Sequence, residues 1–129
     1  MILKNDKVLL GRRHSDAAKA DSELHGEGTW TMPGGKLHFK EELEDGACRE
    51  VLEETGIKIA KEKLEMLSVT NNIVEDAHFL TIGFLYKNAV DEPKVMEPEE
   101  ITEWRWFGLN NLPSPIFFPS KQILEKYLA

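Results

Sequence analysis

The order of hydrophobic and polar residues predicts short strands and a long loop in the first quarter of the chain. Apolar residues on either side of Asn5 and Asp6 predict strands at 2–3 and 8–13, joined by a turn. The polar segment 15–28 contains several glycines and predicts an exposed loop, in which the sequence D-A-A-K-A-D leaves room for one helical turn. Residues 29–32 predict a short extended segment that ends at a Pro-Gly-Gly sequence.

The segment from residue 43 to 55 predicts an amphipathic helix, and Gly56 predicts its end. At 100° per residue its apolar side chains form one broad arc, made of Leu43, Ala47, Cys48, Val51 and Leu52. Glu50 and Glu54 lie at one edge of this arc, with Glu53 and Arg49 further round. The acidic residues are therefore expected where the helix meets the body of the protein, a position suited to a cleft.

The second half of the chain predicts more strands and a closing helix. Two long apolar runs at 64–74 and 77–87 predict strands, as does the alternating segment 101–107. A break at 110–115 precedes a predicted helix at 121–128. Strands, helix, strands and helix in this order predict an α+β fold, and the length of 129 residues predicts one domain over 1–129.

Composition restricts the functions that this domain can have. The formal net charge is −7, which argues against a nucleic-acid partner, although bound divalent cations would still admit a small phosphorylated substrate. The single cysteine, Cys48, excludes an internal disulfide and suits a reducing compartment. No apolar run is long enough for a membrane span, and the first residues lack the apolar region of a signal peptide. We therefore expect a cytoplasmic protein without a membrane partner.

Three glutamates lie within five positions of the predicted helix. Glu50 is three and four residues from Glu53 and Glu54, so their charges repel one another on the helix surface. A solvated acidic face is one explanation of this pattern. The other is a divalent cation, because converging carboxylates are the hard oxygen ligands that Mg²⁺ and Mn²⁺ prefer. The spacing alone leaves both explanations open.

The stretch around these glutamates resembles the signature of the Nudix hydrolases, G-x5-E-x7-R-E-U-x-E-E-x-G-U, where U is a bulky aliphatic residue. Every defined position is filled, by Gly35, Glu41, Arg49, Glu50, Val51, Glu53, Glu54, Gly56 and Ile57. The segments V-L-L-G-R-R, W-T-M-P-G-G and E-W-R-W-F-G-L-N-N-L-P are similar to other parts of Nudix domains. The resemblance implies the Nudix fold, a mixed β-sheet sandwiched between α-helices, with residues 35–57 (the Nudix box) as a loop–helix–loop.

The resemblance also implies roles for the residues of the box. Glu50 and Glu54 are expected to be primary ligands of Mg²⁺ or Mn²⁺, with Glu53 as a further ligand or water activator. The carbonyl of Gly34 is an additional expected ligand. Arg49 is expected to orient the glutamates, which makes Glu53, Glu54 and Arg49 the catalytic set. The general base stays open between Glu53 and a carboxylate of the segment 97–100.

For the substrate, the resemblance to MutT-like members favours a (deoxy)nucleoside triphosphate, including oxidised purine nucleotides, cut to monophosphate and pyrophosphate. The segment 71–75 lacks the proline or tyrosine typical of branches acting on ADP-ribose or dinucleoside polyphosphates. Arg13 and Lys36 are expected to contact phosphate, because cationic side chains complement it. For Arg13, an exposed position at the end of its strand is the alternative. Ser120 is expected either to contact the base or to cap the last helix.

Several alternatives stay open at this point. A nucleotide sugar or ADP-ribose is the alternative substrate, and a non-catalytic nucleotide-sensing module is the alternative function, although such modules usually lose box glutamates. Trp104 and Trp106 share one strand face and are expected in the core or at an interface rather than as a platform for the base. The first predicted strand is shorter than is usual in Nudix domains. A homodimer, in which a second chain completes the sheet, is therefore an alternative that stays open.

Overall fold

Strand β2 (Lys7–Arg13) lies at the centre of the larger of two sheets in the computed structural model, which describes all 129 residues. It pairs antiparallel with three strands, β1 (Leu3–Lys4), β3 (Trp30–Thr31) and β6 (Ile101–Gly108). Val8, Leu9 and Leu10 of β2 have no exposed surface, because side chains cover both faces of this strand.

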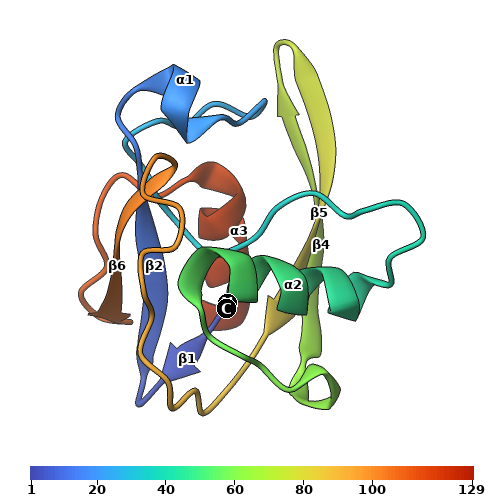
Figure 1. Cartoon of the computed structure of the whole chain (residues 1–129), viewed down its shortest axis with the longest axis vertical. Coiled ribbons are helices and arrows are strands. Elements are labelled where there is room, and N and C mark those ends of the chain that lie inside the picture. The colour runs from blue at the N-terminus through green and yellow to red at the C-terminus, as the bar shows by residue number, and fades with distance from the viewer.

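The second sheet is a long hairpin of β4 (Glu65–Val74) and β5 (Ala77–Leu85). Figure 1 shows that its turn projects well beyond the main sheet, on the same side as α1 (Ala17–Ala20). A parallel bridge between Ile2 and Tyr86 joins the hairpin to the main sheet, so the strands together form a mixed arrangement.

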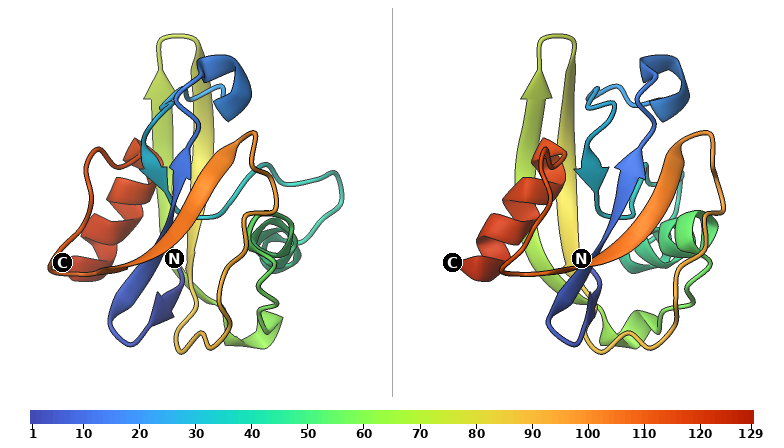
Figure 2. Two further views of the ribbon diagram at one scale, coloured as in Figure 1. Left: turned by 60° about the vertical axis from the view of Figure 1, so that its left-hand side comes forward. Right: turned by 90° about the vertical axis from the view of Figure 1, so that its left-hand side faces the viewer.

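Two longer helices cover opposite sides of the strands (Figure 2). On one side, α2 (Leu43–Thr55) packs through Val51 into a cluster that includes Leu9 and Trp104. On the other, α3 (Phe118–Leu128) buries Ile123 and Leu124 in a second cluster. A short 3-10 helix, η1 (Lys61–Lys63), connects α2 to β4. The result is an α+β architecture with strands between two helices, as the resemblance implied.

Most predicted elements agree with the structure. The helix predicted at 43–55 has these bounds, and Gly56 ends it at φ 74° with its N–H donating to the carbonyl of Leu52. The strand ends agree within two residues, and the helical turn allowed in the long loop is α1. Trp104 is buried and Trp106 packs against the same cluster, which confirms that both belong to the core. None of the helices combines the length and the apolar character needed to cross a lipid bilayer.

The last helix departs from the prediction. It begins at Phe118, three residues before the predicted start, and has Pro119 in its first turn. Proline is favourable there because its fixed φ is already helical and its missing N–H would have no partner. Ser120 therefore lies inside the helix, and the expectation that it caps the helix was wrong. Its hydroxyl instead accepts a hydrogen bond from the N–H of Met32 at 2.9 Å.

Candidate active site

Arg49 of α2 holds the box together. Its Nε and Nη2 donate to the two carboxylate oxygens of Glu41, at 2.8 and 3.0 Å. Its Nη1 donates to Glu50 at 2.8 Å and to Glu53 at 3.2 Å, and Nη2 also donates to the carbonyl of Lys36. Such paired charged hydrogen bonds are stronger than neutral ones and fix geometry. One guanidinium therefore orients two of the three box glutamates and fastens the preceding loop to α2.

Glu41 braces the loop from its other end. One of its oxygens also accepts the N–H of His38 at 2.9 Å. The hydrogen bonds from Arg49 and then from His38 lower the pKa of Glu41 to about 2. Glu41 is therefore ionised at all ordinary pH values. It accepts the hydrogen bonds of Arg49 whether or not a ligand is bound.

Two glycines bring the loop backbone against the glutamates. A Cβ atom on Gly35 would lie only 2.5 Å from the carboxylate of Glu50, so any side chain there would displace that acid. The N–H of Gly34 donates to Glu54 Oε1 at 2.7 Å. The close approach of backbone to carboxylate thus requires glycine at position 35, whereas a Cβ on Gly34 would meet no atom within 4 Å.

Glu54 is the most buried of the box acids, with 8% of its surface exposed. Burial raises its pKa to about 8, even though the N–H of Gly34 opposes the shift, and the charges of Glu50, Glu97 and Glu100 add to it. Burial is also the largest cause that raises the pKa values of Glu97 and Glu100. The acids of α2 and those of the segment before β6 therefore lie close enough together to raise one another's pKa values.

The side chains as they stand do not form a finished coordination sphere. No three Asp, Glu, His or Cys side chains lie close enough together to hold one ion. Glu50 and Glu53 pair with Arg49, and Glu54 pairs with Gly34, so each carboxylate is occupied by a protein donor. The donor chemistry nevertheless fits Mg²⁺ or Mn²⁺, because Glu50, Glu53 and Glu54 offer hard carboxylate oxygens from one helix, and the carboxylate of Glu54 is buried.

The predicted phosphate-binding residues lie near this site but are engaged elsewhere. Arg13 is 8% exposed and donates to the carbonyls of Gly26 and Ala20. Burial lowers the pKa of Arg13, and the charge of the nearby Glu54 is the largest of the effects that raise it. Lys36 Nζ donates to Glu23 at 2.8 Å.

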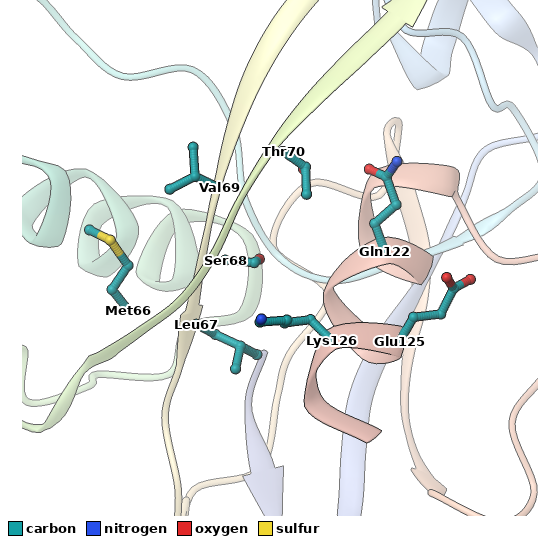
Figure 3. Close-up of a pocket in the computed structure, with 8 residues that line it drawn as sticks. All are labelled: Met66, Leu67, Ser68, Val69, Thr70, Gln122, Glu125 and Lys126. Carbon is teal, nitrogen blue, oxygen red and sulfur yellow. The ribbon is translucent and has the colours of Figure 1, made fainter. Parts of the chain in front are cut away.

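Ser120 is also enclosed, with 4% of its surface exposed and its hydroxyl bonded within the protein. A groove of about 700 Å³ opens nearby between β4 and α3, lined in part by Ser68, Thr70 and Gln122 (Figure 3). None of the box acids lines it, so this groove is separate from the acidic site.

Sequence reasoning missed the contacts between the long loop and the rest of the site. His25 and Asp76 are 51 residues apart in the chain and form an ion pair at 2.9 Å. Glu23 had no distinguishing motif either. No periodicity or spacing signal connects residues this far apart, so only the folded structure identifies them.

Comparison with known proteins agrees with the fold and the box. The NUDIX domain family model matches residues 1–127, and the chain belongs to this family. It is 30% identical to an RNA pyrophosphohydrolase of Bartonella quintana, over 95% of this chain and 80% of that protein. It is 31% identical to an ADP-ribose pyrophosphatase of Methanocaldococcus jannaschii, over 99% and 69% of the two chains.

Among solved structures, the chain resembles a MutT NUDIX hydrolase from Burkholderia pseudomallei. The TM-score is 0.84 at 31% identity, and the match covers 97% of this chain and 91% of the other. The relatives share a family and a fold but carry different substrate names. The class of enzyme follows from these similarities, whereas the substrate does not.

Proposed function

We propose that this Nudix hydrolase cleaves a (deoxy)nucleoside triphosphate, including oxidised purine nucleotides, to the monophosphate and pyrophosphate. The observation that carries the proposal is the intact box, in which Arg49 orients Glu50 and Glu53 beside the buried Glu54. A sensing module would have no need for this complete set of acids. The similarity to an oxidized purine nucleoside triphosphate hydrolase of Mus musculus, 28% identical over 92% of this chain, supports the triphosphate assignment.

Glu50, Glu53, Glu54 and the carbonyl of Gly34 would hold Mg²⁺ or Mn²⁺. When bound, such a cation lowers the pKa of the attacking water and neutralises charge on the phosphates. Arg49 keeps Glu50 and Glu53 in position throughout, because Glu41 holds its other edge. Glu54 has to release its proton to become a ligand, since burial keeps that proton bound at neutral pH.

Glu53 is the strongest candidate for the base that takes the proton from water. Its side chain is 48% exposed and is held by a single 3.2 Å bond to Arg49, so it can reach a water molecule. Glu97 and Glu100 are the alternatives, because both interact electrostatically with the box acids. Proton transfer to a positioned carboxylate is typical general base catalysis.

Arg13, Lys36 and Ser120 are proposed to contact the substrate. This requires Lys36 to leave Glu23, and it requires Arg13 and Ser120 to add a contact to those they already make.

The similarity to an ADP-ribose pyrophosphatase makes ADP-ribose the second candidate substrate. The free thiol of Cys48 suits a reducing compartment, and we place the activity in the cytoplasm.

The test is a substrate panel with Mg²⁺: nucleoside triphosphates, oxidised purine triphosphates, ADP-ribose and GDP-mannose. The nucleoside monophosphate is measured for every substrate, together with pyrophosphate for the triphosphates and sugar phosphate for ADP-ribose and GDP-mannose. Glu54→Gln is the inactivating variant. Glu62→Gln is the matched control, because Glu62 is exposed and forms no ion pair. Pyrophosphate released from triphosphates by the wild type and the control, but not by Glu54→Gln, supports the proposal. Cleavage of ADP-ribose in preference to every triphosphate contradicts the substrate assignment.

A further inference from the structure

The loop formed by residues 21–28 reaches from α1 to the turn of the β4–β5 hairpin. Figures 1 and 2 show the loop crossing the space between α1 and the hairpin. At its tip, His25 Nε2 lies 2.9 Å from Asp76 Oδ1, in the turn of the hairpin. This ion pair is the contact that links the loop to the end of the hairpin.

A second ion pair ties the same loop to the Nudix box. Glu23 accepts a hydrogen bond from Lys36 Nζ at 2.8 Å, and Lys36 lies 5.6 Å from the centre of the Phe79 ring of β5. The loop, the box and the hairpin therefore meet at two ion pairs and one cation–π contact. Lys36 takes part in two of these three interactions.

The base of the loop is held differently from its tip. Arg13 donates to the carbonyls of Gly26 and Ala20, at 3.0 and 3.1 Å, from a buried position. The tip depends on side chains that are largely exposed, 55% for His25 and 65% for Asp76. Exposed ion pairs contribute little stability. Residues 21–25 can therefore separate from the hairpin, while the carbonyls of Ala20 and Gly26 on either side of them stay bound to Arg13.

We propose that loop 21–28 is a gate on the nucleotide side of the active site, latched by the His25–Asp76 ion pair. The inference rests on the proposed function, because that function assigns phosphate contacts to Arg13 and Lys36, and both residues contact this loop. With the gate closed, Glu23 occupies Lys36, so a substrate phosphate has to displace a carboxylate. Entry of the nucleotide accordingly competes with closure of the loop.

The latch is strongest when His25 is protonated, because a neutral ring can still donate from Nε2 to Asp76 but carries no charge. The charged groups that act on it are Asp76 on the hairpin and Glu27 on its own loop. The hydrogen bond from His25 to Asp76 is the largest cause that raises the pKa of His25 above its ordinary value, and the charge of Glu27 acts in the same direction. The ion pair is present below that pKa and is lost as the pH rises through it. The gate is therefore held at acidic pH and loosens at alkaline pH.

Asp76→Asn removes the latch without touching the acids of the box. His78→Asn is the matched control, because His78 lies on the same hairpin but bonds only to Asn71. At pH 6, amide hydrogen exchange over residues 21–25 is expected to be about two- to five-fold faster in Asp76→Asn than in the wild type, which is the range expected for loss of an exposed ion pair. It is expected to be unchanged in His78→Asn. His25→Asn should reproduce the effect of Asp76→Asn.

Hydrolysis gives the second readout. At pH 6, Asp76→Asn is expected to raise kcat/KM for the best nucleotide by about two- to five-fold with kcat unchanged, and to match the wild type near pH 8.5. Unchanged exchange in Asp76→Asn overturns the latch, whether or not the protein hydrolyses nucleotides. Faster exchange with unchanged kcat/KM overturns the gate. If the wild type cleaves no substrate, the proposed function fails, and the exchange experiment still decides the latch.

Discussion

The buried carboxyl of Glu54 should make the metal-free protein less stable as the pH rises. Its pKa is about 8 in the folded protein, against an ordinary value of 4.5 that applies to the unfolded chain. Between these values the folded state keeps a proton that the unfolded state has lost. The free energy of unfolding therefore decreases with pH, by about 1.4 kcal/mol per unit. From pH 5 to pH 7 the loss is roughly 2.5 kcal/mol, and from pH 5 to pH 8 it is roughly 3.5 kcal/mol, because the slope is smaller close to either pKa.

The assay is urea unfolding in EDTA at pH 5, 6, 7 and 8, for the wild type and Glu54→Gln. Glutamine has the shape of the protonated acid and does not titrate, so the difference between the two proteins isolates this one group from every other carboxylate. The two should be similarly stable at pH 5, and Glu54→Gln should be several kcal/mol more stable at pH 8. A difference that stays constant across this range would refute the reasoning.

The same proton also links pH to metal binding. Because Glu54 has to ionise before it can act as a ligand, the apparent affinity for Mn²⁺ should rise by up to about ten-fold per pH unit below pH 8. Calorimetric titrations in buffers of different ionisation enthalpy should show about one proton released per bound ion. Binding without proton release at pH 7 would contradict the assignment of Glu54 as a ligand.

Three further predictions follow from close contacts. Gly35→Ala should abolish activity while the protein stays folded by circular dichroism, because its Cβ would meet the Glu50 carboxylate at 2.5 Å; wild-type kcat would contradict this. Arg49→Lys should lower kcat by at least ten-fold at saturating Mg²⁺, because lysine cannot make the forked contacts of the guanidinium. Gly11→Ala should lower the free energy of unfolding by about 1–3 kcal/mol in urea, because its Cβ would lie 2.7 Å from the Trp104 ring.

The Nudix box was predictable because its structure is local. The bounds of α2 follow from an apolar arc and from Gly56, and Arg49 reaches Glu53 because they are four residues apart on one helix. Arg49 reaches Glu41 across only eight residues. In such a segment, spacing along the chain translates directly into distance in space.

Features that depend on the packing of distant segments were not predictable in this way. Ser120 satisfies every local criterion for a helix cap, yet β3 packs beside α3, and the hydroxyl bonds to Met32 instead. Arg13 was predicted as an exposed strand end or a phosphate contact, but the folded loop supplies two carbonyls that enclose it. The pairing of His25 with Asp76 likewise depends on how far the hairpin projects.

The most direct test of the metal-dependent active site is the rate of nucleotide hydrolysis as a function of Mg²⁺ concentration, for the wild type, Glu54→Gln and Glu62→Gln. We expect saturable activation by Mg²⁺ in the wild type and in Glu62→Gln. In Glu54→Gln, we expect a rate no higher than that of the wild type in EDTA. Hydrolysis by Glu54→Gln at the wild-type rate, or a wild-type rate that is unchanged in EDTA, would contradict the assignment of the box acids as the catalytic centre.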